Sequence, residues 1–555
     1  MSSDLVRLAQ AWLAQDPDPE TRAELEALLS GGDEAALRDR FQAKLEFGTA
    51  GLRGELGAGP NRMNRVTVMR AAAGLAAVLG PGRHVVIGYD ARHNSDVFAR
   101  DTAAVLTGAG LQASLLPAPL PTPVLAFAVR HLGADAGVTV TASHNPPRDN
   151  GYKVYWGDGS QIVPPVDAEI SAAIDAAGPV SELPLGSPED PSWTDLGQEI
   201  VAAYLDAVTL LPLGDARDLR VAYTPLHGVG GVTLTSAFLA AGFEGPVTVE
   251  AQADPDPDFP TVAFPNPEEP GAMDLALELA GRIGADLVLA NDPDADRCAV
   301  GVPLPGGGYR MLTGDEVGAL LGEHVIRQTS GDRLVATTIV SSSLLGKIAA
   351  DYGVRYAETL TGFKWIMKAG SERGDGGGLV FGYEEALGYS VGSDGGLPVH
   401  DKDGIGAALT VAGLAAGARR DGRTLLDLLD DQARRYGLHA TSQLSVRVSD
   451  LSLIAGAMAR LRATPPAELG GRKVESAEDL NLGAGGLPPT DGLRYLLTGG
   501  ARVVVRPSGT EPKLKCYLEV VVPVTGEVAG ARARAAEDLS ALKLDLAALL
   551  DLGSA

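Results

Sequence analysis

Cysteine is almost absent from this chain of 555 residues, in which Cys298 and Cys516 are the only two. So few cysteines imply no disulfide framework, and the default compartment for such a protein is a reducing cytoplasm. The sequence also lacks an uninterrupted apolar stretch long enough for a transmembrane helix. Residues 1–15 are typical of an amphipathic helix and lack the basic start and long apolar run of a signal peptide. We therefore expect a cytoplasmic protein.

Basic residues are outnumbered, because 46 Lys and Arg stand against 71 Asp and Glu and give a net charge of −25 at pH 7. This deficit argues against a nucleic-acid partner or an anionic membrane surface, both of which favour a basic face. A phosphorylated small molecule remains compatible, since a few local cations can dominate one cleft. No linker or coiled coil points to a particular assembly, and we expect a monomer or a homodimer.

Strand-like and helix-like segments alternate along much of the chain, starting with a strand at 85–89 and a helix at 96–108. This alternation predicts a parallel or mixed sheet covered by helices, and similar segments begin again near Leu219 and Leu312. From about Leu438 the pattern changes to strands with helices between them. The length and the 45% apolar content fit several domains of about 100–200 residues.

We therefore predict an α/β protein with three similar α/β/α domains with mixed sheets, plus a distinct C-terminal α+β domain. The predicted domains span residues 1–205, 206–311, 312–437 and 438–555.

A strand-to-loop segment, TVTASHNPPRDNGYKVY, contains the first group of candidate catalytic residues. Its β-prone start leads to Ser143 and His144, two prolines then stop regular structure, and Asn150-Gly151 is predicted to form a turn. A hydroxyl at the end of a strand is well placed to carry a group to a substrate. His144 and Lys153 are candidate proton carriers or charge partners. Taken alone, the Ser-His pair would fit an ordinary polar loop better.

Three aspartates, Asp292, Asp294 and Asp296, follow an apolar strand at alternate positions. The proline after the first of them disfavours a helix, and in an extended loop this spacing directs all three carboxylates to one side. Three hard oxygen ligands suit Mg²⁺. A calcium-binding EF-hand loop would need Gly and Glu where Arg297 and Pro303 stand. A haloacid-dehalogenase-type loop would need Thr or Val in place of Asp296, and a solvated acidic turn is the remaining alternative.

A candidate phosphate site, RPSGTEP, begins at Arg506 after an apolar strand. Gly509 lets the backbone approach an anion, Ser508 and Thr510 add hydroxyl donors, and Arg506 can hold two phosphate oxygens at once. Lys513 adds a further positive charge. The alternative is a solvated turn, but this concentration of cations and donors in an acidic protein favours a phosphate site.

Two further loops give weaker signals. The loop at residues 47–54 combines glycines with Arg53, so its backbone N–H groups could face an anion, although a plain turn fits as well. Glu384 and Glu385 lie between two glycines and could accept hydrogen bonds from sugar hydroxyls, although paired glutamates are usually just surface. Together the loops supply a nucleophile, a metal site, a hydroxyl-binding group and a phosphate site, which phosphoryl transfer to and from a phosphosugar requires.

The set of motifs resembles the α-D-phosphohexomutase (phosphoglucomutase/phosphomannomutase) family. TASHNP, Asp-x-Asp-x-Asp-Arg, Gly-x-Glu-Glu and Arg-x-Ser-Gly-Thr-Glu-Pro occur in the family's order over most of the chain. The resemblance implies four domains around a central cleft, which contribute a phosphoserine loop, a metal loop, a sugar loop and a phosphate loop in turn. Ala386 stands where many members have Ser. The loop Gly-Tyr-Glu-Glu-Ala, with a later Asp-Lys-Asp-Gly, resembles the branch of long bacterial phosphoglucomutases and phosphopentomutase-like enzymes.

The resemblance also implies a role for each matching residue. The implied catalytic residues are Ser143, as phosphoserine, with Arg53, His144 and Lys153. The implied Mg²⁺ ligands are Asp292, Asp294, Asp296 and a phosphoryl oxygen on Ser143. The implied substrate-binding residues are Arg297, Lys364, Glu384, Glu385 and Lys402. The implied phosphate-binding residues are Arg506, Ser508, Gly509, Thr510 and Lys513.

The implied activity is interconversion of glucose 1-phosphate and glucose 6-phosphate through phosphorylated Ser143 and glucose 1,6-bisphosphate, which serves as bound intermediate and activator. A phosphomannomutase or a phosphopentomutase with the same mechanism is the alternative. A sugar-phosphate binding protein without turnover is an alternative from another class. A serine hydrolase is disfavoured, because the sequence has no Gly-x-Ser-x-Gly elbow and His144 is poorly placed as the base of a triad.

Overall fold

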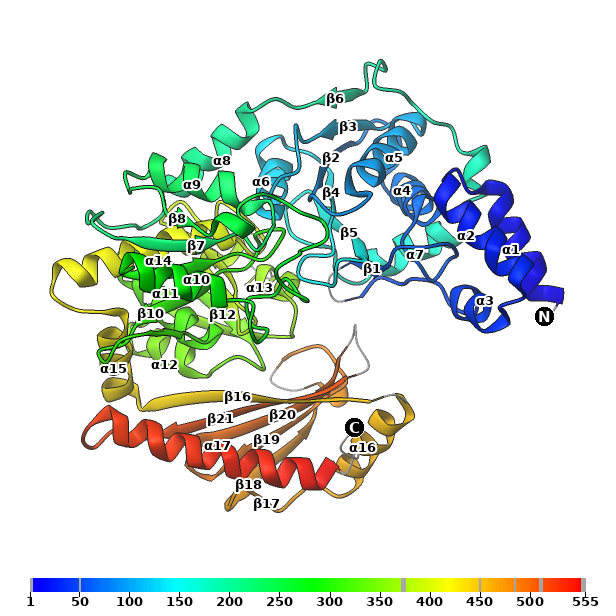
Figure 1. Cartoon of the computed structure of the whole chain (residues 1–555). Helices are drawn as coiled ribbons and strands as arrows, with labels where there is room; N and C mark the ends of the chain where they lie inside the picture. Colours follow the sequence, from blue (N-terminus) through cyan, green and yellow to red (C-terminus); the bar gives the residue numbers. More distant parts are fainter. Residues whose placement is uncertain are drawn as a thin grey trace. The chain divides into compact units, whose positions relative to one another are not determined.

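The computed structural model of the chain divides into two compact units (Figure 1). Unit 1 comprises Met1–Leu312, Gly388–Gly392 and Leu397–Gly417, and unit 2 comprises Thr313–Leu387, Ser393–Gly396 and Ala418–Ala555. The structure describes residues 3–48, 51–370, 376–448, 451–483, 486–508 and 513–550.

Unit 1 begins with three helices, α1 (Ser3–Gln15), α2 (Pro19–Gly31) and α3 (Glu34–Phe41). Local signals in the sequence set the breaks between these helices. Asp18 caps α2 by accepting a hydrogen bond from the N–H of Glu20, with Pro19 at the first helical position. Gly32, in the left-handed conformation, ends α2.

The first sheet of unit 1 is mixed and has the strand order β1-β5-β4-β2-β3-β6. Strands β4, β2, β3 and β6 run parallel, whereas β5 is antiparallel to both β4 and β1. Its strands are β1 (Leu52–Glu55), β2 (His84–Tyr89), β3 (Gln112–Leu115), β4 (Ala136–Val140), β5 (Asp149–Trp156) and β6 (Trp193–Asp195). The accompanying helices are α4 (Arg65–Leu79), α5 (Ser95–Gly108), α6 (Thr122–His131), α7 (Val166–Ala176), the short η1 (Val180–Glu182) and α8 (Glu199–Thr209).

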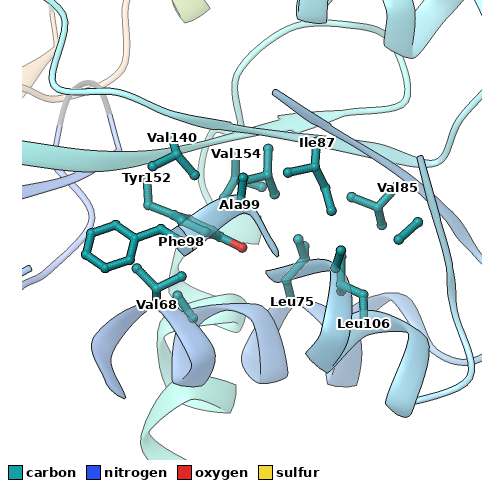
Figure 2. Packing of buried hydrophobic residues seen from close by; sticks show 14 of the residues in the cluster. Val68, Leu75, Val85, Ile87, Phe98, Ala99, Leu106, Val140, Tyr152 and Val154 are labelled. Carbon is teal, nitrogen blue, oxygen red and sulfur yellow. The ribbon is translucent and has the colours of Figure 1, made fainter. Parts of the chain in front are cut away.

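The core between this sheet and two of its helices is closely packed and apolar. Figure 2 shows Val68 and Leu75 of α4 and Phe98 of α5 facing Ile87 of β2 and Val140 of β4, and all five are fully buried. Burying an aliphatic or aromatic side chain of this size contributes about 1.5–3 kcal/mol. The core therefore anchors β2 and β4, from whose carboxyl ends the loops of the candidate site emerge.

The predicted turn at Asn150-Gly151 is wrong, because both residues lie inside strand β5. Gly151 pairs with Arg53 of β1, and Lys153 pairs with Thr139 of β4. A Cβ at Gly151 would lie 2.5 Å from the carbonyl oxygen of Thr141, so this glycine allows close strand packing. The hydrogen-bond partners of β5 come from strands far away in the sequence, and local turn propensity gives no sign of them.

The second sheet of unit 1 is also mixed, with the order β11-β10-β9-β7-β8. The pairs β7–β8 and β7–β9 are parallel, and β10 is antiparallel to β9 and β11. Its strands are β7 (Val221–Thr224), β8 (Val247–Thr248), β9 (Leu287–Ala290), β10 (Ala299–Pro303) and β11 (Tyr309–Met311). The accompanying helices are α9 (Gly230–Ala240), η2 (Glu250–Gln252) and α10 (Asp274–Ile283). Residues 254–270 form a long loop.

The third sheet has the order β13-β12-β14-β15, with β12 parallel to β13 and β14. Its strands are β12 (Leu334–Thr338), β13 (Arg355–Thr359), β14 (Leu379–Glu384) and β15 (Gly388–Val391). The helices of this part of the chain are α11 (Gly314–Gln328), α12 (Leu344–Asp351), α13 (Phe363–Met367), η4 (Gly376–Gly378), α14 (Gly404–Arg420) and α15 (Leu425–Tyr436).

The fourth sheet, in unit 2, differs from the others because all its pairings are antiparallel, in the order β16-β21-β20-β19-β18-β17. Its strands are β16 (Leu438–Arg447), β17 (Glu468–Leu469), β18 (Arg472–Asp479), β19 (Leu493–Leu497), β20 (Ala501–Pro507) and β21 (Lys513–Val522). The helices are α16 (Leu451–Ala463), η5 (Leu480–Leu482), η6 (Thr498–Gly500) and α17 (Val528–Leu550). Figure 1 shows α17 lying along this sheet.

The predicted fold class is confirmed: three α/β/α parts with mixed sheets precede a distinct C-terminal α+β part. Within the part of the chain that the structure describes, no helix combines the length and the apolar character needed to cross a membrane.

Candidate active site

Ser143 lies in the loop between β4 and β5 and is fully buried. Its backbone has φ of 54°, a left-handed conformation that is uncommon for residues other than glycine. The N–H of Ser143 donates to Oγ1 of Thr141 at 2.8 Å, which helps to hold this conformation. Its Oγ donates to Oδ2 of Asp292 at 2.7 Å and lies 3.1 Å from Nδ1 of His144. The loop thus places one hydroxyl between a carboxylate and an imidazole.

The three aspartates leave the carboxyl end of β9 and gather into one cluster. Asp292, Asp294 and Asp296 are fully buried, and each offers a carboxylate oxygen within 4.8 Å of the others. The loop is not extended as the sequence analysis assumed, because it turns at Ala295, which has φ of 55°. The clustering therefore depends on a turn as well as on the alternate spacing.

Two lysines compensate part of this negative charge. Nζ of Lys153 lies 2.7 Å from Oδ2 of Asp294 and 3.0 Å from Oδ2 of Asp296. Nζ of Lys402 also lies 3.0 Å from Oδ2 of Asp296. Burial alone would lower the pKa of Lys153, but the carboxylates of Asp294 and Asp296 outweigh it and raise this pKa above its usual value. Lys153 is therefore a charged partner of the cluster.

The cluster retains unused ligand oxygens. Oδ1 of Asp294 and Oδ1 of Asp296 are buried and receive no hydrogen bond from the residues that the structure describes. Burial and the charges of Asp294 and Asp296 raise the pKa of Asp292 to about 8, because the nearby cations do not fully offset a third ionised carboxylate. Buried carboxylate oxygens without partners are rare in proteins, and hard oxygens are the ligands that divalent cations prefer. The residues present therefore fit a divalent metal ion.

Cations surround His144. Its Nε2 lies 3.4 Å from Nη2 of Arg297. Burial and the charges of Arg297, Arg53 and Lys402 lower the pKa of His144 well below its usual value, so this imidazole is neutral at pH 7. Nη1 of Arg53 donates to Oδ1 of Asn145 at 3.4 Å. Arg53 itself lies in the edge strand β1 and not in the loop that the sequence predicts at residues 47–54.

The predicted sugar loop follows β14 in unit 2, and its two glutamates differ. Glu385 is bound within the protein, because its Oε2 accepts hydrogen bonds from Oγ of Ser341 at 3.0 Å and from Oγ1 of Thr338 at 3.3 Å. Burial, with the charge of Glu384 beside it, raises the pKa of Glu385 to about 7. Glu384, the last residue of β14, is half-buried.

The predicted phosphate loop lies in the same unit. Arg506 is in β20, and its positive charge acts on the buried Tyr517 of β21, where it opposes the rise in the pKa of Tyr517 that burial causes. The N–H of Ser508 donates to the carbonyl oxygen of Lys513 at 2.8 Å and closes the base of the loop. Gly509 and Thr510 lie outside the described residues. Lys364 is a half-buried residue of α13.

The structure also adds residues that sequence reasoning missed. Oγ1 of Thr122, at the start of α6, donates to Oδ2 of Asp294 at 2.7 Å, and its N–H donates to the carbonyl oxygen of Asp294. Arg92 lies in the loop after β2, three residues beyond the end of the strand, and holds the Ser143 loop by hydrogen bonds to its backbone. Their positions beside the carboxyl ends of parallel strands, where site loops gather, were the available signal.

Comparisons with known proteins agree with this geometry. Four models of the phosphoglucomutase/phosphomannomutase family match: α/β/α domain I at residues 44–180, domain II at 202–305, domain III at 313–436 and the C-terminal domain at 446–525. A "Probable phosphomannomutase" of Haemophilus influenzae is 47% identical over 82% of this chain and 93% of that protein. A phosphopentomutase of Homo sapiens is 34% identical over 92% of this chain and 90% of its own length.

A solved structure of a phosphoglucomutase/phosphomannomutase family protein from Burkholderia thailandensis has the same fold, with a TM-score of 0.68 at 19% identity. The alignment covers 92% of this chain and 98% of that one. Fold, site and relatives together define an isomerase that acts on small sugar phosphates. The chain belongs to the phosphoglucomutase/phosphomannomutase family, also called the α-D-phosphohexomutases.

Proposed function

We propose that the protein is a phosphoglucomutase, which interconverts glucose 1-phosphate and glucose 6-phosphate through phosphorylated Ser143 and bound glucose 1,6-bisphosphate. The contact between Oγ of Ser143 and Asp292 carries this proposal, because it puts a buried serine hydroxyl against a carboxylate cluster that fits a metal ion. A nucleophile beside a divalent cation is the arrangement that phosphoryl transfer needs.

The reaction begins with transfer of the phosphoryl group from Ser143 to the free hydroxyl of the sugar monophosphate. The bisphosphate that results reorients in the site and returns its other phosphoryl group to Ser143, which leaves the isomeric monophosphate. Asp292, Asp294 and Asp296, with a phosphoryl oxygen on Ser143, would hold Mg²⁺. When bound, Mg²⁺ offsets the negative charge on the transferring group.

His144 is our candidate for the group that accepts the proton of the attacking sugar hydroxyl. Its neutral imidazole lies beside Ser143 and can take up a proton, whereas Lys153 is already charged and paired with two carboxylates. Arg53 carries a permanent charge and stabilises the phosphoryl group. Arg297 and Lys402, which border the same cluster, orient the substrate's phosphate.

The loops that contain Glu384 and Arg506 bind the non-reacting parts of the substrate. Glu384 accepts hydrogen bonds from sugar hydroxyls, and Lys364 assists it. Glu385 supports this loop from within the protein, since its carboxylate is already occupied by Ser341 and Thr338. The distal phosphate is held by Arg506, Ser508, Gly509, Thr510 and Lys513.

Mannose and pentose phosphates are the second candidates, and the relatives favour them. Proteins similar to this chain are named phosphomannomutase, phosphoribomutase and phosphopentomutase. Others are named glucose 1,6-bisphosphate synthase, which supports the bisphosphate as ligand and activator. Because all these substrates need the same transfer chemistry, the sugar preference depends on the loop that contains Glu384.

Phosphorus NMR tests the function directly. The enzyme, Mg²⁺ and a trace of glucose 1,6-bisphosphate are mixed with glucose 1-phosphate, mannose 1-phosphate or ribose 1-phosphate in separate tubes. We expect conversion to the isomeric phosphate, fastest for glucose. Faster conversion of another sugar would change the substrate assignment. Release of inorganic phosphate alone would indicate a phosphatase, and binding without conversion in any tube would favour a sugar-phosphate binding protein.

A further inference from the structure

Arg92 binds the backbone of the Ser143 loop at four points. Its side chain is nearly fully buried. The two terminal nitrogens donate to four carbonyl groups, three in the loop and one at the start of β5. The acceptors are the carbonyl oxygens of Ser143 at 2.6 Å, Asn145 at 2.6 Å, Pro146 at 2.8 Å and Asp149 at 3.1 Å.

The remaining faces of the guanidinium group are also fixed. Its Nε lies 3.5 Å from Oδ2 of Asp90, and Oδ1 of Asp90 accepts hydrogen bonds from the N–H of Arg92 and from Oγ of Ser95. The ring of Phe259 covers the group, with the guanidinium carbon 4.9 Å from the ring centroid. Arg92 is therefore held in one orientation, by Asp90 just after β2 on one side and by the ring of Phe259 on the other.

Phe259 comes from the long loop at residues 254–270, which joins elements of the second sheet. Although that loop runs mostly over the surface, Phe259 is only 2% exposed and adopts the left-handed conformation with φ of 46°. Asp258 beside it lies 2.8 Å from Nε2 of His93, and Glu268 lies 3.2 Å from Nη1 of Arg297. The loop thus contacts both the Arg92 side chain and the margin of the candidate active site.

The Ser143 loop needs such support. It forms neither strand nor helix between β4 and β5, and the left-handed conformation of Ser143 costs on the order of 1–2 kcal/mol. Without Arg92, the carbonyl group of the buried Ser143 would lose this hydrogen-bond donor. The planar fork of an arginine fixes several acceptors at once, which the point charge of a lysine cannot do.

We propose that Arg92 is a positioning residue for phosphoryl transfer, and that Phe259 holds Arg92 in place. Arg92 touches none of the reacting atoms. It fixes the loop so that Oγ of Ser143 stays against Asp292 and the metal-binding cluster. This role rests on the proposed function of Ser143 as the phosphoserine, and it concerns the rate of transfer more than the binding of the sugar.

Unit 1 contains a matched control. Arg217 donates to the carbonyl oxygens of Ala241, Gly214 and Ala216 at 2.7–2.8 Å, and its guanidinium carbon lies 4.7 Å from the ring centroid of Phe243. It has the same chemistry as Arg92, but none of these partners belongs to the Ser143 loop or to the aspartate cluster. Arg217→Lys therefore measures the loss of such an arginine as a purely structural element.

The experiment compares Arg92→Lys, Phe259→Leu and Arg217→Lys with the wild type. Readouts are kcat, KM for glucose 1-phosphate, the melting temperature and the phosphate content of Ser143 by intact mass. We expect Arg92→Lys to lower kcat by about 10–100-fold with little change in KM, because small misplacements of a reacting group have effects of this size. Phe259→Leu, which leaves every hydrogen bond of Arg92 in place, should lower kcat by a few-fold. Arg217→Lys should lower only the melting temperature.

The outcomes separate this role from the proposed function. A wild type that turns over without phosphate on Ser143 would overturn both. A phosphorylated wild type with unchanged kcat in folded Arg92→Lys would overturn only the role of Arg92. Equal losses of kcat in Arg92→Lys and Arg217→Lys would assign the effect to general stability and also overturn it. If Arg92→Lys fails to fold, Phe259→Leu decides: a fall in kcat without a change in KM supports the role, and an unchanged kcat contradicts it.

Discussion

Oγ of Ser143 lies 2.7 Å from Oδ2 of Asp292, although the two residues are 149 positions apart in the chain. Ser143 follows a strand of the first sheet and Asp292 follows a strand of the second. This hydrogen bond therefore joins two α/β/α parts of unit 1. The contact joins the proposed nucleophile to the proposed metal ligands.

Replacing a cluster aspartate should abolish metal-dependent turnover. Asp294→Asn keeps the shape of the side chain but removes the charge of a ligand whose Oδ1 has no partner among the described residues. We expect kcat to fall on the order of 100-fold or more, since the charge on the transferring group loses its compensation. Mg²⁺ should raise the melting temperature of the wild type and not that of Asp294→Asn. The exposed Asp254→Asn is the control, and equal activity of the two variants would remove the metal assignment.

Removing the buried lysine should destabilise unit 1. Lys153→Met leaves Asp294 and Asp296 without their shared cation, and breaking a buried ion pair from one side costs about 3–5 kcal/mol. The free energy of unfolding from urea titration gives the loss, and Mg²⁺ should restore part of it. Lys44→Met breaks the exposed pair with Asp175 and should cost about 0–1 kcal/mol. Similar losses in both variants would show that the cluster does not depend on Lys153.

Unit 2 should lose stability in acid through Glu519. This buried carboxylate accepts a hydrogen bond from Ser342 at 2.8 Å and contacts His439 and Arg502 at 2.9 and 3.1 Å. Burial opposes ionisation, but these partners outweigh it and lower the pKa of Glu519 from 4.5 to about 2. As the pH falls, the unfolded chain therefore takes up a proton at Glu519 before the folded protein does. The stabilisation that ionised Glu519 gives the folded protein is complete above about pH 4.5 and disappears as the pH falls toward 2.

Glu519→Gln should accordingly lower the free energy of unfolding by roughly 2–4 kcal/mol at pH 7. The difference from the wild type should shrink between pH 4.5 and pH 3, as measured by urea unfolding. The exposed Glu475→Gln is the control and should show no such trend. A difference that stays constant over this range would contradict the ion-pair account.

The two adjacent glutamates of the sugar loop should behave differently. Glu384→Gln removes a charged acceptor for sugar hydroxyls, which is worth about 1.5–3 kcal/mol, so kcat/KM should fall by roughly 10–100-fold. Glu385→Gln should change kcat/KM much less, because its carboxylate is bound to Ser341 and Thr338. Steady-state kinetics with glucose 1-phosphate test this pair, and a larger loss for Glu385→Gln would reverse the assignment.

The raised pKa of Glu385 should make stability depend on pH with the sign opposite to that of Glu519. Its pKa is raised from 4.5 to about 7, so the folded protein keeps a proton that the unfolded chain has already lost. Wild-type stability should therefore fall between about pH 4.5 and 7 through this group. Relative to the wild type, Glu385→Gln should gain stability from pH 5 to pH 8, by roughly 1–3 kcal/mol. Parallel stability curves for the two proteins would contradict the raised pKa.

Much of the fold could be predicted because local signals and tertiary structure agree. The helix predicted at 96–108 begins one residue earlier in the structure, as α5 (Ser95–Gly108). Predictions failed where distant segments decide the conformation. Asn150-Gly151 has the sequence of a turn, but β1 and β4 pair with it from both sides.

The candidate active site could likewise be predicted only in part. The spacing of Asp292, Asp294 and Asp296 predicted a cluster, but the turn at Ala295 that completes it leaves no mark in the sequence. The sequence could not show that Glu384 and Glu385 differ in role. The side chains that hydrogen-bond Glu385, Thr338 and Ser341, come from the end of a different strand, β12. The role of Arg92 was missed because its acceptors are main-chain carbonyl groups, which no residue type in the sequence reveals.

Single turnover of the isolated phosphoenzyme tests the central claim most directly. Phosphorylated protein is mixed with an equal amount of glucose 1-phosphate and Mg²⁺, quenched at successive times, and analysed by intact mass and phosphorus NMR. We predict that the protein loses one phosphate as glucose 1,6-bisphosphate forms and regains it as glucose 6-phosphate forms, and that Ser143→Ala does neither. Formation of glucose 6-phosphate at full rate with no change in protein mass, or in Ser143→Ala, would contradict the account.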